Sequence, residues 1–107
     1  MNKSLMTPEI RELFEGMLTL QTVDECYAFF EDVCTIKEIL AFSQRFEVAK
    51  MLRQNKTYLE ITEKTSASTA TISRVNRSLN YGCEGYDLVL QRLAEKQGAE
   101  EANAETA

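Results

Sequence analysis

Hydroxyl, amide and guanidinium side chains are concentrated in the stretch SASTATISRVNRSLN, residues 66–80, and no carboxylate lies between Lys64 and Glu84. Hydroxyls and amides bond to DNA base edges or phosphates, and arginine binds phosphate or the guanine edge. This chemistry predicts a nucleic-acid contact. The residues that we expect to contact DNA are Thr57, Ser68, Thr69, Ala70, Thr71, Ser73, Arg74, Asn76, Arg77 and Asn80.

The charge of the chain is unevenly distributed. The net charge is −5, yet residues 41–81 carry seven basic and three acidic side chains, and the segments on either side are acidic. A basic centre between acidic ends is expected when one surface meets phosphates. Chance clustering on a solvated face would give the same counts, so charge alone does not decide the partner.

Several function classes are disfavoured by composition. The chain has no histidine, and its four glycines form no phosphate-binding loop, so we expect neither an enzyme nor a cofactor. The three cysteines lack the spacing of a disulfide framework or a zinc site, and we expect them to be small buried side chains. No apolar run reaches the roughly 20 residues of a membrane span. The charged N-terminus does not resemble a secretory signal, which favours a cytoplasmic protein.

The elements that must position the candidate DNA-contacting side chains are predicted to be helices. A short helix over residues 58–64 is followed by a break at residues 65–67, and Ser68 can cap a second helix. Ile72, Val75 and Leu79 would anchor the second helix by a thin apolar side. This is the pattern of a helix-turn-helix over about residues 57–80, although a structural helical hairpin with a polar outer face fits it as well.

The rest of the chain is also predicted to be helical. Thr7-Pro8 opens a first helix, and capping boxes at Thr22, Thr35 and Thr57 each place a Glu three residues on. A long helix over about 36–54 and a last helix over about 86–96 complete a single all-α domain, residues 1–97. We expect the acidic tail, residues 98–107, to be disordered, with a continuing helix as the alternative because Ala and Glu favour helices.

An apolar stripe on the first helix exceeds what one small core covers. It consists of Ile10, Leu13, Phe14, Met17 and Leu18, and the long helix is apolar on more than one face. We therefore expect a homodimer.

The span TIKEILAFSQRFEVAKMLRQNKTYLEITEKTSASTATISRVNRSLN, residues 35–80, resembles the Trp repressor family, most closely in SASTATISRVNRSL. Residues 8–96 are similar to the YerC/YecD-type branch of that family. The resemblance implies six helices in an intertwined homodimer, with one helix-turn-helix per subunit in the major groove of double-stranded DNA. It also implies a transcriptional regulator, expected to be a repressor at a palindromic operator.

The same resemblance implies an effector pocket. Residues at the family's corepressor positions are Thr35, Arg45, Thr71, Arg74 and Ser78. Val75 stands where the family has a glycine, against which the flat ring of the ligand lies. We therefore expect tryptophan to bind weakly or not at all. A smaller or differently shaped effector could still bind to the same arginines.

A second function class fits the same residues. A helical protein–protein adaptor would keep the fold, the apolar first helix and the acidic ends without binding DNA. Retention on heparin or mixed DNA at low salt distinguishes the two classes.

Overall fold

The computed structural model describes residues 1–106 and contains only helices within that part of the chain. A short 3-10 turn, Lys3–Leu5, precedes six α-helices: α1 (Pro8–Met17), α2 (Val23–Val33), α3 (Ile36–Arg53), α4 (Tyr58–Thr65), α5 (Thr69–Tyr81) and α6 (Gly85–Thr106). The chain divides into two compact units, residues 1–41 and 42–107, where the sequence suggested one domain. Each unit is described by itself.

The helix starts follow the hydroxyl caps expected from the sequence. Thr7 accepts a hydrogen bond from the Ile10 amide at 3.2 Å, and Pro8 occupies the first turn, where its missing N–H costs nothing. Thr35 and Glu38 form a reciprocal capping box at 2.8 and 3.1 Å, which lowers the pKa of the Glu38 carboxyl.

The other two expected capping boxes differ from each other. Thr57 and Glu60 exchange both hydrogen bonds, as the Thr-x-x-Glu spacing predicts. At the start of α2, Glu25 reaches one residue further back and accepts from the amide of Gln21 at 2.9 Å, not from that of Thr22. Thr22 still caps the helix through the Glu25 amide, so the boundary is as expected and only the return bond differs.

The turn between α4 and α5 passes through a left-handed residue. Ser66 has φ 59° and ψ 13°, and its amide donates to the Thr62 carbonyl at 2.9 Å to close α4. Glycine is favoured in this conformation, because a Cβ there costs roughly 1–2 kcal/mol. Thr65 reinforces the turn by accepting from the Ala67 amide at 3.1 Å.

The variant Ser66→Gly is expected to raise the free energy of unfolding by about 0.5–1 kcal/mol, since relief of left-handed strain exceeds the extra backbone entropy lost by glycine. The matched control is Ser73→Gly within α5, which removes the same side chain from an exposed helical position and should cost about 1 kcal/mol. Urea unfolding of both variants measures the two changes. A loss of stability in Ser66→Gly would contradict the strain argument.

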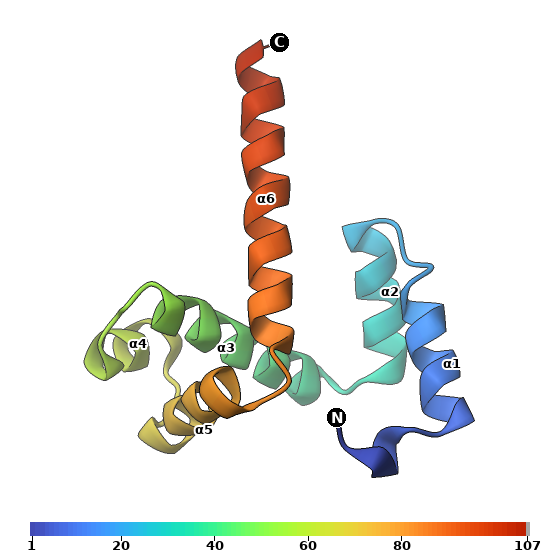
Figure 1. Ribbon diagram of the computed structural model, residues 1–107, viewed down its shortest axis with the longest axis horizontal. Coiled ribbons are helices and arrows are strands. Elements are labelled where there is room, and N and C mark those ends of the chain that lie inside the picture. Colours follow the sequence, from blue (N-terminus) through green and yellow to red (C-terminus); the bar gives the residue numbers. More distant parts are fainter. Residues whose placement is uncertain (107) are drawn as a thin grey trace. The chain divides into compact units, whose positions relative to one another are not determined.

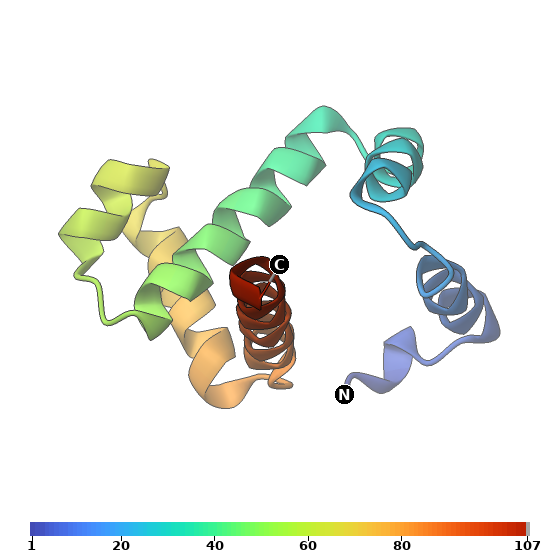
Figure 2. The same cartoon turned by 90° about the horizontal axis from the view of Figure 1, so that it is seen from above.

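The C-terminal unit has one hydrophobic core, built by α3, α4 and α5. Its buried members are Val48, Ala49, Met51, Ile61, Ala67, Ile72, Val75 and Leu79, and Leu52, Tyr86 and Leu90 pack against them. In this unit α5 lies across the C-terminal half of α3, with α4 beside both (Figures 1 and 2). Helix α5 therefore packs against α3 and α4 through one face, and its opposite face is exposed.

A close backbone approach ends α5. The Gly82 amide donates to the Ser78 carbonyl at 2.9 Å, and a Cβ at Gly82 would meet that carbonyl oxygen well inside van der Waals contact. Any side chain at this position would force the end of α5 to shift. Gly82 is therefore required for the tight turn into α6.

The last helix is longer than the sequence suggested. We expected an ordered helix to about residue 96 and a disordered tail over 98–107, but α6 continues to Thr106 and extends away from the other helices of its unit (Figure 1). Alanine and glutamate in the tail are good helix formers, and this propensity accounts for the continuation. Residue 107 lies outside the described residues.

The N-terminal unit exposes much apolar surface and buries no side chain completely in α1 or α2. Phe14 is 54% exposed, Leu18 85% and Tyr27 65%. Cys26 is also exposed, as is Cys83 in the other unit, so the expectation of three buried cysteines is wrong for these two. Cys26 lies on α2, and Cys83 lies in the turn between α5 and α6. None of the helices described has the length and apolarity needed to cross a membrane.

Candidate nucleic-acid interface

Helix α5 separates its apolar and polar residues cleanly. Ile72, Val75 and Leu79 are buried against the core, at the spacing of one helix face. The side chains that face solvent are Thr69, Ala70, Ser73, Arg74, Arg77, Ser78, Asn80 and Tyr81. The structure thus brings most of the predicted DNA-contacting residues onto one exposed helix that the core holds in place.

Both arginines of α5 are free to meet a partner outside the chain. Neither Arg74 nor Arg77 makes a side-chain hydrogen bond or ion pair with any residue that the structure describes, and both are exposed. Elsewhere the arginine and lysine side chains Arg11, Lys50 and Arg53 are paired with carboxylates. Arg74 therefore forms no ion pair within the described part of the chain.

Three of the predicted contact residues are engaged in capping. The Ser68 side chain accepts from the Thr71 amide at 3.1 Å and donates to the Thr71 hydroxyl at 3.0 Å. Thr57 is used in the capping box of α4. These hydroxyls hold the first turns of α4 and α5, so their immediate structural role is to orient the helix starts.

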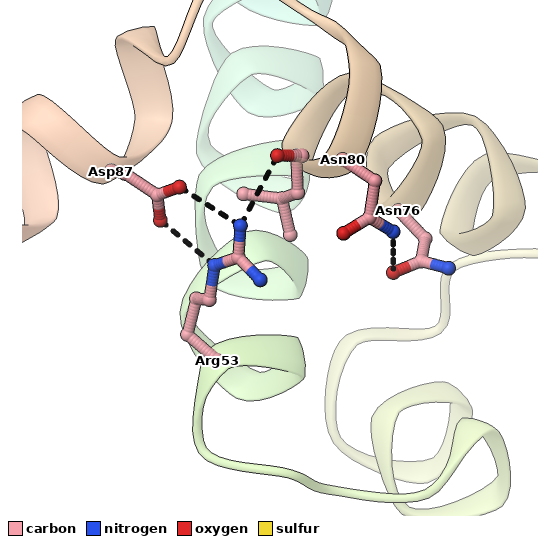
Figure 3. Close-up of polar contacts among 5 residues, drawn as sticks. Arg53, Asn76, Asn80 and Asp87 are labelled. Carbon is pink, nitrogen blue, oxygen red and sulfur yellow. Dashed lines mark hydrogen bonds and ion pairs between the residues drawn. The ribbon is translucent and has the colours of Figure 1, made fainter.

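Two asparagines pair along α5. Asn80 donates from its amide nitrogen to the Asn76 side-chain oxygen at 3.4 Å, across one helical turn, and Asn76 is half-buried (Figure 3). Asn76 keeps its side-chain nitrogen available, and Asn80 keeps its side-chain oxygen. The pair can therefore still donate and accept outside the helix.

The basic side chains in the second half of α3 have partners within the chain. Lys50 pairs with Glu47 at 2.9 Å, and Arg45 lies over the Phe42 ring at 5.2 Å from its centroid. Arg53 pairs with Asp87 at 2.8 Å. Of the seven basic residues of 41–81, these three therefore have an internal partner, and the four others, Lys56, Lys64, Arg74 and Arg77, lie beside or on α4 and α5.

Lys56 and Lys64 are further candidate phosphate contacts that the sequence analysis did not include. They line a shallow groove of about 440 Å³ with Glu47, Lys50, Met51, Gln54 and Glu60, and neither has an ion-pair partner among the described side chains. Glu47 and Glu60 are committed to Lys50 and to the α4 cap. Both lysines are among the seven basic residues of 41–81, but only the structure shows that they stay unpaired.

The residues expected to form an effector pocket have separate surroundings. Arg45, Thr71, Arg74 and Ser78 belong to the C-terminal unit, and none of them lines the groove described above. Arg45 contacts Phe42, and Thr71 serves the cap of α5. Thr35 belongs to the N-terminal unit, where it caps α3.

The position of Val75 corrects one sequence-based argument. Val75 was expected to stand in the floor of a ligand pocket, but it is 2% exposed and belongs to the hydrophobic core. It lies one turn after Ile72 and one turn before Leu79, on the face that α5 turns to α3 and α4. The side chain is therefore a structural anchor of α5 in this chain.

The Arg53 guanidinium couples α3 to α6 through its ion pair with Asp87. Its hydrogen bonds to Asp87 lower the pKa of that carboxyl and raise the pKa of Arg53. A depressed carboxyl pKa contributes stability above the unfolded-state value near 3.9, and that contribution is lost as the pH falls through the folded-state pKa.

The variant Asp87→Asn should therefore be less stable than the unaltered protein from pH 7 to 5, with the difference shrinking below about pH 4. Both carboxyl and guanidinium are 43% exposed, so the difference should be small. Thermal unfolding across this pH range measures it, with Asp32→Asn at an exposed and unpaired position as control. A difference that persists at pH 2 would show that the charge of Asp87 is not its source.

The described residues contain no group of three or more Cys, Asp and Glu side chains that could hold a metal ion. The exposed face of α5 offers hydrogen-bond donors, hydrogen-bond acceptors and positive charge. Such a face suits recognition of a nucleic acid.

Comparisons with known proteins agree with this geometry. Residues 8–94 match the Trp repressor protein family. The chain is 52% identical over 89 residues to the uncharacterized protein YerC of Bacillus subtilis (strain 168), covering 83% of this chain and 86% of that protein. The crystal structure of a TrpR-like protein from Eubacterium eligens ATCC 27750 is similar with a TM-score of 0.85 and 66% identity, covering 87% of this chain and 96% of that one.

A crystal structure of a Staphylococcus aureus protein named for the Trp repressor is similar with a TM-score of 0.83 and 48% identity, covering 86% of this chain and 92% of that one. The six helices, their order and the helix-turn-helix of α4 and α5 are thus a Trp-repressor-like fold. The chain belongs to the Trp repressor protein family.

Proposed function

We propose that this protein is a sequence-specific DNA-binding transcriptional regulator that acts as a homodimer and represses transcription. The observation that carries the proposal is the exposed face of α5, where Arg74 and Arg77 have no partner in the described chain and hydroxyl and amide groups flank them. Helix α5 is the recognition helix, α4 supports it, and the Ser66 turn sets the angle between them.

The N-terminal unit supports a homodimer. Large apolar side chains of its helices remain exposed, including Leu18 at 85%, Ile36 at 75% and Leu40 at 64%. Burial of such side chains contributes about 1.5–3 kcal/mol each, and a second copy supplies a surface of the same kind. Two-fold symmetry then places two α5 helices about 34–36 Å apart, which requires a palindromic site.

The function is tested by sequencing the DNA fragments that the protein binds in the cell and then measuring affinity for the recovered sequence and for mixed DNA. Affinity should fall steeply with salt, with a log–log slope of about −0.9 per phosphate contacted. Sedimentation equilibrium should give a dimer at micromolar concentration. Absence of any DNA retention at low salt would overturn the proposal.

The exposed apolar face also favours a second function, that of a protein–protein adaptor. An adaptor would bind neither heparin nor DNA and would retain the fold. The DNA experiment decides between the two, because only a DNA-binding regulator enriches a palindromic sequence.

A further inference from the structure

Arg53 connects three helices through one guanidinium group. It is the last residue of α3, and its Nε and Nη2 donate to the two carboxylate oxygens of Asp87, each at 2.8 Å. Nη2 also donates to the main-chain carbonyl of Leu79 at 3.1 Å. Figure 3 shows this fork between the end of α3, the end of α5 and the beginning of α6.

The two partners of Arg53 lie at helix termini that suit its charge. Leu79 is in the last turn of α5, where carbonyls have no partner within the helix and a cation is favoured by the helix dipole. Asp87 is in the first turn of α6, where a carboxylate is favoured. The Asp87 carboxylate is charged at neutral pH, and its hydrogen bonds to Arg53 lower its pKa. One guanidinium group therefore joins the end of α5 to the beginning of α6, and its charge suits both partners.

The remaining contacts between α5 and α3 are apolar. Ile72, Val75 and Leu79 pack into the core, and such contacts are roughly proportional to area and have no direction. They hold α5 against α3 but leave small rotations of α5 about its axis inexpensive. A bidentate Arg–carboxylate pair with a third bond to main chain is directional, so it selects one orientation.

We propose that Arg53 is a positioning residue for DNA recognition. It does not touch DNA. By fixing α5 relative to α3 and α6, it holds the side chains of α5 against the DNA base edges that they contact. The proposal rests on the proposed DNA-binding function. Contacts to base edges need this placement, whereas attraction to phosphates depends on charge and tolerates a small rotation.

Arg53→Lys tests the fork, because lysine keeps the charge and loses the planar, two-pronged geometry. Its affinity for the palindromic sequence should fall about two- to fivefold, the most that an exposed ion pair can contribute to orientation, while affinity for mixed DNA and the salt slope stay unchanged. Asp87→Asn should give the same pattern, and the double variant should lose no more than either single one, as expected for one shared unit.

The matched control is Arg11→Lys, which alters another Arg–carboxylate pair, with Glu15 at 2.7 Å, in the N-terminal unit. It should leave both affinities unchanged. Circular dichroism should show that the Arg53 and Asp87 variants are folded, because a pair that is 43% exposed on each side contributes little to stability.

Equal losses on both DNAs, with the salt slope reduced by about one, would show that Arg53 contacts a phosphate and would overturn the positioning role. Unchanged affinities would overturn it as well. If the unaltered protein binds no DNA, the proposed function fails, and residual dipolar couplings still test the fork. A changed orientation of α5 relative to α3 in Arg53→Lys supports it, and an unchanged orientation overturns it.

Discussion

Replacing Arg74 and Arg77 together by alanine should abolish sequence-specific DNA binding while leaving the fold intact. Each arginine that reads a guanine edge contributes about 1–3 kcal/mol of discrimination, so each single variant should lose roughly 5- to 150-fold in affinity for its site. Both side chains are exposed and without partners in the described chain, so their removal should change stability by less than about 0.5 kcal/mol.

The single variants distinguish the two roles open to each arginine. At a phosphate, Arg77→Ala weakens binding to all sequences alike and reduces the salt slope by about one; at a guanine, it relaxes one base position. Arg92→Ala on α6 is the matched control, since it removes an exposed arginine elsewhere. Electrophoretic mobility shifts at several salt concentrations measure these effects. Unchanged affinity and slope in the double variant would exclude α5 as the recognition helix.

Truncation of Val75 is expected to destabilise the C-terminal unit strongly. The side chain is 2% exposed in the only hydrophobic core that the described C-terminal unit contains. Val75→Ala should lower the free energy of unfolding by about 2–3 kcal/mol, and Val75→Gly by about 1 kcal/mol more because glycine weakens a helix interior. Val89→Ala, at a position 51% exposed on α6, is the control and should cost much less.

The burial of Val75 changes how an effector should be sought. Creating the family's glycine at this position would remove a core anchor, so Val75→Gly cannot by itself restore a ligand site. Because Thr71 is engaged in the cap of α5 and Arg45 lies over the Phe42 ring, we expect free tryptophan neither to bind the unaltered protein tightly nor to be required for DNA binding. Isothermal titration calorimetry with tryptophan, with and without DNA, measures both. Tight binding by the unaltered protein would contradict this expectation.

Helix boundaries were predictable wherever the signal is local. Thr7, Thr22, Thr57 and Ser68 cap helices at the expected positions, because a cap needs only a hydroxyl and an amide two or three residues away. The end of α6 was not predictable in the same way. Its Ala- and Glu-rich tail has neither a stop signal nor an apolar face, so composition allowed both helix and disorder.

The sequence predicted which face of α5 is exposed, but it did not predict the role of each side chain on and near that face. Alternation of Ile72, Val75 and Leu79 with polar residues identified the outward side of α5. The pairing of Arg53 with Asp87 joins residues 34 positions apart, and no local pattern indicates it. For Val75 the local pattern predicted an anchor of α5, which its burial confirms, whereas its place in the floor of a ligand pocket came from a family position transferred without the packing around it.

Five helices of this chain carry their own hydroxyl cap, and the C-terminal core joins helices that follow one another in sequence. Helical proteins with such local contacts fold within microseconds to milliseconds, since little loop closure precedes the first packing. A newly synthesised chain should therefore complete its C-terminal unit before it meets a second copy. For the proposed homodimer, the encounter between chains, which depends on their concentration, then sets how soon the dimer accumulates after synthesis begins.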